Sequence, residues 1–159
     1  MKIKFSPIGI IHTPFKEIGN MPIQPSADIS SEGWIEIFER YSAGLADLEG
    51  FSHIYLIFHL HQSKRYKLKV IPFLDTVERG IFATRSPARP NPVGLSVVKL
   101  ISVTGNILKI QGLDILDGTP LIDIKPFVPM FEDSENVITG WFSGKERNLP
   151  GKMSDGRFK

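Results

Sequence analysis

The chain has 159 residues, of which 42% are hydrophobic and 23% are charged. This length corresponds to about one domain, and the composition is close to the globular average, which argues against wholesale disorder. The lack of cysteine excludes disulfides, thiolate metal sites and a cysteine nucleophile, and a net charge of +2 only mildly favours a polyanionic partner.

The first half of the chain predicts short strands joined by loops. Residues 8–11 form an apolar run that should be a strand ending near Pro14, and residues 34–38 form a second one. Between them, residues 16–32 show little periodicity and predict a long loop, a type of segment that is often functional. Residues 42–48 predict a short helix closed by Gly50, and residues 54–60 predict a central strand.

The second half continues in the same way. Residues 67–73 alternate, with Lys67 and Lys69 outward and Leu68 and Val70 inward, as in an antiparallel strand with one wet face. Residues 80–84 predict another short strand. Residues 95–101 and 107–113 flank the turn signal 103–106 and predict a hairpin. Residues 121–125 predict a strand, and residues 137–142 either a last strand or a short cap.

Short strands therefore dominate, and no strand–helix–strand alternation is visible. We expect a mainly β fold, a closed or nearly closed antiparallel β-barrel with minor helices. Residues 1–142 should form this barrel domain and residues 143–159 a loose basic tail. No signal peptide and no apolar run long enough for a membrane span is visible, so we expect a cytoplasmic protein without membrane contact.

The most informative segment is residues 85–94, where three prolines alternate with polar side chains. The prolines restrict their own backbone and that of the residues before them, so the loop should be stiff before any ligand binds. Arg85, Arg89 and Asn91 carry several hydrogen-bond donors on this frame, which suits a carboxylate or a phosphate. The alternative is a proline-rich barrel corner whose arginines are only solvated.

Residues 113–126 place Asp114, Asp117 and Asp123 among apolar strand residues. A buried carboxylate is costly unless it is paired or has a function. The turn formed by Asp117, Gly118, Thr119 and Pro120 could present backbone groups to a ligand. Alternatively, Asp117 only stabilises its own turn, and Asp123 pairs with Lys125.

His59 and His61 lie two residues apart on the same side of a predicted strand. A metal site would need a third ligand, and none stands at convincing spacing, so we expect no metal. His61 with Gln62 is better explained as a polar ligand contact, or simply as the point where the strand meets water. Dinucleotide-binding, phosphate-loop and hydrolase motifs are absent from the sequence.

The run from Lys64 to Lys69 combines four cations with the aromatic ring of Tyr66. Such a pattern is typical of a nucleic-acid contact, in which cations meet phosphates and a ring stacks on a base. A solvated hairpin explains it equally well.

Four segments together resemble the TsaA-like (TrmO-type) family. The resemblance covers about residues 5–131 in order, and the block from Arg85 to Ser96 is its most specific part. The segments are Ile-Gly-Ile-Ile-His-Thr-Pro-Phe at 8–15, Leu-Glu-Gly-Phe-Ser-His at 48–53, Phe-Ala-Thr-Arg-Ser-Pro-Ala-Arg-Pro-Asn-Pro-Val-Gly-Leu-Ser at 82–96, and Asp-Gly-Thr-Pro at 117–120 followed by Asp-Ile-Lys-Pro at 123–126.

This resemblance implies a methyltransferase that uses S-adenosyl-L-methionine on a β-barrel. The acceptor that it implies is tRNA, methylated on N6 of threonylcarbamoyl-adenosine beside the anticodon. It also implies a homodimer. The cofactor contacts that it implies are Pro22, Ile23, Gln24, His61, Gln62, Arg85, Leu95, Asp117, Gly118, Thr119 and Pro120, and it directs Arg89, Asn91 and Lys125 toward the tRNA or the transferred methyl group.

The chain also departs from this family. It ends soon after the predicted barrel, whereas the bacterial tRNA methyltransferases of the family have a further C-terminal domain, and Phe127 stands where relatives often have tyrosine. Asp114 or Asp123 could serve as the general base, with Lys125 or Arg89 stabilising an anion. The competing hypothesis is a non-catalytic sensor that binds S-adenosylmethionine or a nucleotide, and a third is methyl transfer to another acceptor.

Overall fold

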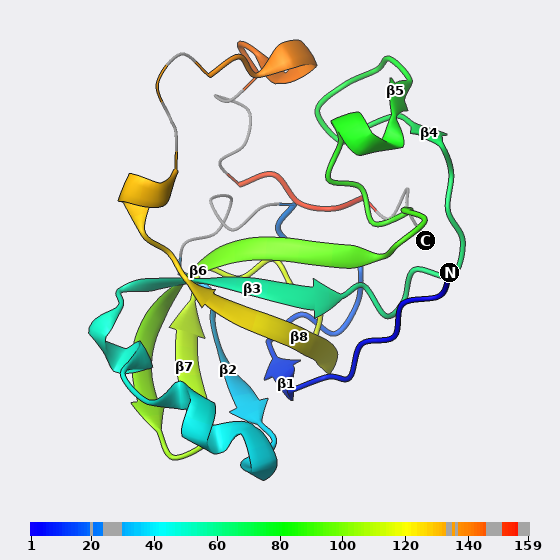
Figure 1. Cartoon of the computed structure of the whole chain (residues 1–159). Helices are drawn as coiled ribbons and strands as arrows, with labels where there is room; N and C mark the ends of the chain where they lie inside the picture. Colours follow the sequence, from blue (N-terminus) through cyan, green and yellow to red (C-terminus); the bar gives the residue numbers. More distant parts are fainter. Residues whose placement is uncertain (20, 24–29, 133–134, 136, 146–150, 156–159) are drawn as a thin grey trace.

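The computed structural model of the chain describes residues 1–19, 21–23, 30–132, 135, 137–145 and 151–155. Strands form a closed antiparallel barrel in the order β1-β2-β7-β6-β3-β8 (Figure 1). They are β1 (Gly9–His12), β2 (Glu32–Ile37), β3 (His53–His59), β6 (Val93–Thr104), β7 (Ile107–Gln111) and β8 (Thr119–Pro126). The prediction of a mainly β, closed barrel is confirmed.

Short elements surround the barrel. The two-stranded sheet of β4 and β5 and the 3-10 helix η4 stand apart from it at one side (Figure 1). The bounds of all these short elements are β4 (Lys69–Val70), β5 (Arg79–Gly80), η2 (Glu39–Leu45), η3 (Leu48–Gly50), η4 (Ile81–Ala83), η5 (Pro129–Phe131) and η6 (Gly140–Phe142).

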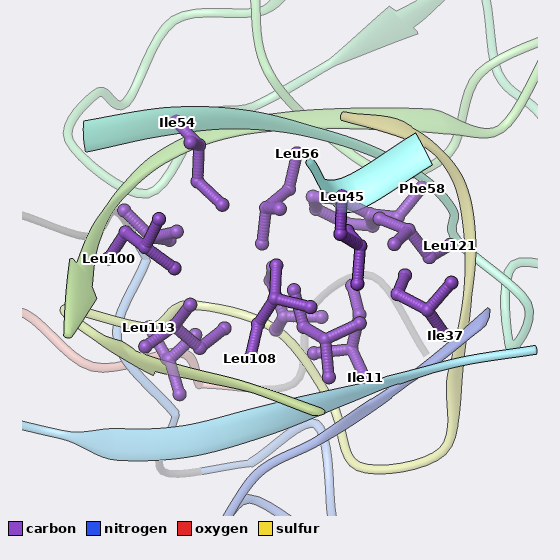
Figure 2. Close-up of a cluster of buried hydrophobic side chains, with 14 residues drawn as sticks. Ile11, Ile37, Leu45, Ile54, Leu56, Phe58, Leu100, Leu108, Leu113 and Leu121 are labelled. Atoms are coloured by element: carbon purple, nitrogen blue, oxygen red, sulfur yellow. The ribbon is translucent and has the colours of Figure 1, made fainter. Parts of the chain in front are cut away.

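The barrel interior is filled by alternate residues of its strands. In β3, Ile54, Leu56 and Phe58 are buried, while the residues between them face outward. Because successive side chains of a strand point to opposite faces, this alternation builds an apolar core and an outer surface from one strand. Figure 2 shows the core side chains converging inside the ring of strands.

Strand β3 occupies a central position, as residues 54–60 predict. It pairs with β6 on one side, from His53 opposite Lys99 to His59 opposite Val93. On its other side it pairs with β8, with a register shift at Ile57 and Phe58. β-Branched and aromatic residues are enriched in strands, and this segment contains Ile54, Tyr55, Ile57 and Phe58.

The hairpin predicted around residues 103–106 joins β6 to β7. Gly105 has a φ of +59°, a left-handed conformation that glycine adopts without steric cost. Asn106 continues the turn, and its side-chain amide donates to the Ile37 carbonyl at 2.8 Å. The hairpin prediction is confirmed, and the turn is also tied to β2.

Two predicted strands around residue 75 are wrong or too long. Residues 81–83 form η4 instead of a strand, since the Thr84 N–H bonds back to the Ile81 carbonyl. The strand expected over 67–73 is limited to β4, and Leu68 is 62% exposed rather than inward. Beyond Val70 the segment soon reaches Pro72, which has no N–H for a sheet bond.

The predicted helix over 42–48 is replaced by two 3-10 helices. Asp47, with a φ of +67°, separates η2 from η3, because a left-handed residue interrupts a right-handed helix. Within residues 137–142, Gly140–Phe142 form the short helix η6, and no strand is present there. None of the helices in the described ranges is long and apolar enough to cross a membrane.

Parts of the expected long loop and of the expected tail lie outside the described residues. In the described parts, these two distant segments meet. Pro22 and Met153 form an isolated antiparallel bridge, and the Ser154 N–H donates to the Met21 carbonyl at 2.8 Å. The division into a barrel domain over 1–142 and a tail over 143–159 stays a prediction.

Candidate functional site

A pocket of about 810 Å³ opens where the carboxyl end of β3 meets the amino end of β6. Phe58 and Leu60 line it from the first strand and the residue after it, and Val93, Gly94 and Leu95 line it from the second. Residues 72–74 and 82–87 contribute further walls, as do Thr139, Trp141 and Phe142. This volume, with largely apolar walls and a few polar groups, is typical of a site for a small organic ligand.

Gly94 allows β6 to pair with β3 beside the Phe58 ring. It stands opposite Phe58 in the β3–β6 register, and a Cβ at this position would overlap the Phe58 ring. The glycine therefore lets the Phe58 ring lie close to the β6 backbone where both residues line the pocket. Any side chain here would push the ring away.

Asp114 supplies the pocket with a carboxylate that is half-buried. Ser96, on β6, donates its hydroxyl to Asp114 Oδ1 at 2.7 Å. Burial raises the pKa of Asp114 to about 6, against the smaller lowering effects of the Ser96 hydrogen bond, its own backbone N–H and the charge of Arg85. A carboxylate with such a pKa can accept a proton near neutral pH.

The hydrogen bonds of Thr119 determine which ring nitrogen of His61 carries the proton. Thr119 Oγ1 donates to the Leu116 carbonyl at 2.7 Å and lies 3.3 Å from His61 Nδ1. A hydroxyl has a single hydrogen, so His61 Nδ1–H must be the donor of the second bond. Burial, followed by the nearby His59, lowers the pKa of His61, so the ring is neutral and Nε2 remains an acceptor at the pocket wall.

The proline-rich loop is stiffened by its own hydrogen bonds as well as by proline. Ser86 N–H donates to Thr84 Oγ1 and Ala88 N–H donates to Ser86 Oγ, both at 3.3 Å. From outside the loop, the Ser63 hydroxyl donates to the Pro87 carbonyl at 2.8 Å. The loop is thus held in place from two directions.

The two arginines of this loop do different things. Arg89 lines the pocket, but its Nη1 donates to the carbonyls of Ile81 and Thr84 at 3.2 and 2.7 Å, so it connects the loop to η4. Arg85 also lines the pocket, is exposed, and acts electrostatically on Asp114. Arg85 is thus an exposed cation of the pocket lining that lies near Asp114.

The Asp117 turn faces β1 instead of the pocket. The Asp117 carboxylate accepts a hydrogen bond from the Thr13 backbone N–H at 3.0 Å and forms an ion pair with Lys16 Nζ at 2.7 Å. The contact with Lys16 is the main cause of the lowered pKa of Asp117. Gly118, with a φ of +73°, completes a tight turn as predicted. Only Thr119 of the four turn residues lines the pocket.

Most of the predicted cofactor contacts gather at this pocket. Lining residues among them are Pro22, Ile23, His61, Gln62, Arg85, Leu95 and Thr119, and the candidate catalytic residues Asp114 and Arg89 also line it. Gln24 lies outside the described residues. Asn91, Asp123 and Lys125 are not among the lining residues; Asp123 and Lys125 form an exposed ion pair at 3.0 Å on β8.

One wall of the pocket comes from residues that the sequence analysis did not single out. Trp141 and Phe142 of η6 line the pocket beside Ala83, since the Trp141 indole N–H donates to the Ala83 carbonyl at 2.7 Å. The adjacent aromatic residues Trp141 and Phe142 were the available signal. The partner of Trp141, 58 residues earlier, could not be identified from sequence.

A charged cluster holds this wall. Asp75, whose side chain is only 6% exposed, pairs with Arg79 Nη2 at 2.8 Å and with Lys145 Nζ at 2.9 Å. Both cations also make cation–π contacts with the Trp141 ring. The hydrogen bond from Lys145 is the largest cause of the strongly lowered pKa of Asp75. We call Asp75, Arg79, Lys145 and Trp141 the Asp75 cluster.

Histidine and acidic side chains do not assemble into a metal site in the described part of the chain. No group of three or more of them is arranged to hold a metal ion there. His12 instead stacks on Trp34 with ring centroids 5.0 Å apart, and His53 accepts or donates a bond with Ser52 at 2.9 Å.

The chain is similar to proteins that are named as S-adenosyl-L-methionine-binding proteins or as tRNA methyltransferases. A protein from Pyrococcus abyssi, named a probable S-adenosyl-L-methionine-binding protein, is 52% identical over 158 residues, covering 99% of this chain and 86% of the relative. The tRNA (adenine(37)-N6)-methyltransferase of Escherichia coli is 39% identical over 139 residues, covering 81% of this chain and 59% of the relative.

Among solved structures, that of TrmO from Pseudomonas aeruginosa is similar with a TM-score of 0.75 and 36% identity, covering 88% of this chain and 62% of that one. The chain thus spans less than two thirds of the bacterial methyltransferases that it matches. The family model described as the tRNA-methyltransferase O N-terminal domain matches residues 10–133. The chain therefore belongs to the family of the tRNA-methyltransferase O N-terminal domain.

Proposed function

We propose that this protein binds S-adenosylmethionine in the β3–β6 pocket and transfers its methyl group to N6 of an adenine in tRNA. The observation that carries the proposal is Asp114, a half-buried carboxylate with a raised pKa in a pocket of small-molecule size. The acceptor is threonylcarbamoyl-adenosine beside the anticodon. Membership of the family and the methyltransferase names of the relatives support methyl transfer to N6 of an adenine in tRNA, and the threonylcarbamoyl group is part of the proposal.

The residues of the pocket fit the chemistry of this cofactor. S-adenosylmethionine has a carboxylate, a cationic sulfonium and an adenine ring. Arg85 would hold the carboxylate by charge-assisted hydrogen bonds, and the acceptor Nε2 of His61 suits the exocyclic amine of adenine. The apolar and aromatic walls, including Phe82 and Trp141, suit the flat faces of the base. When bound, the cofactor supplies an electrophilic methyl group.

Asp114 is the proposed general base. A threonylcarbamoylated N6 is a urea-type nitrogen, whose lone pair is delocalised, so its proton must leave as the new carbon–nitrogen bond forms. Asp114 accepts that proton at a carboxylate oxygen and releases it to solvent afterwards. With a pKa of about 6 it is ionised above that pH and still basic enough to act. Ser96 orients the carboxylate. Holding the nucleophile in line is the other main contribution of the protein.

The assignment of Asp114 rather than Asp123 rests on position. Asp123 is 45% exposed and paired with Lys125, and neither residue lines the pocket. Asn91 and Lys125 are proposed instead to contact the tRNA outside the pocket. The homodimer is also a proposal, and sedimentation of the purified protein tests it directly.

Two assays test the proposed function. Calorimetry should show saturable binding of S-adenosylmethionine to the wild type and weaker binding to Arg85→Ala, with Lys99→Ala as a control cation outside the pocket. Transfer of labelled methyl groups is then measured on tRNA with and without threonylcarbamoylation. Methylation of the modified tRNA alone is expected.

Each failure has a distinct meaning. Stoichiometric binding with no consumption of the cofactor, in the presence of modified tRNA, would support the sensor and refute the enzyme. Equal methylation of both tRNA forms would refute the proposed acceptor while keeping the methyl transfer. A folded protein that binds no S-adenosylmethionine would refute the cofactor assignment.

A further inference from the structure

We infer that Lys64, Arg65, Tyr66 and Lys67 form a docking surface for the RNA strand that presents the acceptor base; we call these four residues the basic rim. This inference rests on the proposed function and names where its RNA substrate binds. It goes beyond the pocket, because none of the four residues lines it.

The backbone of the basic rim is fastened to the wall of the pocket. Immediately before it, Gln62 and Ser63 line the pocket, and the Ser63 hydroxyl donates to the Pro87 carbonyl at 2.8 Å. At its other end, the Lys67 N–H donates to the Ala88 carbonyl at 3.1 Å. The rim thus follows the proline-rich loop, so a strand bound to it passes the pocket mouth.

The charges of the basic rim are not used within the part of the chain that the structure describes. No ion pair, side-chain hydrogen bond or ring contact there involves Lys64, Arg65 or Lys67, and all three are exposed. The neighbouring Lys69, in contrast, pairs with Glu78 at 3.9 Å. Three adjacent cations without a neutralising carboxylate repel one another, and phosphate groups would relieve this repulsion.

Tyr66 makes RNA the partner that these observations favour over an acidic protein. Its side chain is 60% exposed and lies between Arg65 and Lys67 in the chain. An exposed ring between cations offers an unpaired base a stacking surface while its phosphates meet the cations on either side. The region beside an anticodon is single-stranded, so its bases are available for stacking.

The test compares two variants that change the net charge equally. Lys64→Gln/Lys67→Gln removes two rim cations, and Lys99→Gln/Lys109→Gln removes two exposed cations of β6 and β7 that lie outside the pocket lining. Binding of modified tRNA is measured by filter binding from 50 to 300 mM KCl, together with calorimetry of S-adenosylmethionine. The rim variant should lower the slope of log K against log salt by about 1.4, at about 0.7 for each lost single-strand phosphate contact.

Tyr66 is tested separately, with Tyr66→Ala expected to weaken RNA binding about 5- to 150-fold and Tyr66→Phe to preserve it. Cofactor affinity should be unchanged in every variant, which shows that the fold is intact. Equal slopes for the two double variants would overturn the inference, as would equally tight binding of poly-glutamate. Wild-type protein that binds cofactor but no tRNA would instead refute the proposed function.

Discussion

The Ser96 hydroxyl donates to the Asp114 carboxylate at 2.7 Å, inside a pocket whose burial raises the pKa of that acid to about 6. These opposing influences set the pH at which Asp114 becomes a base. Because the ionised form accepts the proton, methyl transfer should rise with pH through about 6 and then level off. The rate constant at saturating tRNA, measured from pH 5 to 8, tests this prediction.

Variants of Asp114 and Ser96 separate the role of the general base from the role of the hydroxyl that orients it. Asp114→Asn should lose methyl transfer at least 100-fold while still binding S-adenosylmethionine, and Asp123→Asn should stay near wild type. Ser96→Ala removes a bond that favours the charged carboxylate, so the midpoint of the pH profile should move up by about one unit. A midpoint that stays the same in Ser96→Ala would exclude Asp114 as the titrating group.

The raised pKa of Asp114 also has an effect on stability. The folded state holds this proton more tightly than the unfolded chain, so the group costs stability as pH rises from about 4 to 6. At neutral pH, Asp114→Asn should therefore be more stable than wild type by on the order of 2–3 kcal/mol, and at pH 4 the difference should largely vanish. Urea denaturation at both pH values measures it.

The Thr119–His61 contact leads to a second pH dependence. The lowered pKa of His61 keeps its ring neutral at pH 7, and protonation in acid would place a hydrogen on the accepting Nε2. Cofactor affinity should then fall as pH drops below the ordinary histidine range. His61→Ala should weaken binding about 10-fold and remove this dependence. Calorimetry in the Asp114→Asn background isolates the effect from the carboxylate.

Gly94 and Phe58 are predicted to be coupled. Gly94→Ala would force the Phe58 ring to move, which should lower stability by about 1–3 kcal/mol and weaken cofactor binding. The double variant Gly94→Ala/Phe58→Leu has room for the added methyl group, so it should bind the cofactor better than Gly94→Ala alone. Additive effects of the two changes would show that the overlap is not the cause.

The Asp75 cluster should matter for the pocket and not only for stability. Asp75→Asn removes the carboxylate that joins Arg79 to Lys145, so the wall formed by η6 should loosen and cofactor affinity should fall several-fold. Because the pKa of Asp75 is held well below its usual range, the wild-type wall should be insensitive to pH between 5 and 8. Glu78→Gln, which removes only the exposed pair with Lys69, is the control.

Local signals accounted for most of the barrel. The hairpin turn at Gly105 and Asn106, the β3 strand and the tight turn at Gly118 follow from backbone preferences and from alternation within a few residues. The strand predicted over 80–84 is wrong because Gly80 already ends β5, whereas the apolar residues Ile81, Phe82 and Ala83 form η4. The composition of such a short segment does not distinguish a strand from a 3-10 helix when the position of a pairing strand is not known.

The site was less predictable because it depends on contacts between distant segments. Two backbone carbonyls hold the Arg89 guanidinium, a contact that no spacing rule reveals, and the expected role of Arg89 toward a ligand stays a prediction. Asp117 likewise bonds to Thr13 and Lys16, about a hundred residues earlier. The alternative considered for Asp123, a pair with Lys125, is the arrangement observed, because strand neighbours two apart share one face.

The Asp75 cluster has a consequence for behaviour at high temperature. The free-energy penalty for removing charges from water falls on heating, whereas apolar stabilisation per unit area levels off. The wall that η6 contributes is fastened by one carboxylate shared between two cations, with a tryptophan ring stacked beneath both. Heating should therefore loosen this wall later than loops held by apolar contact alone, and the pocket should keep its shape up to temperatures near global unfolding.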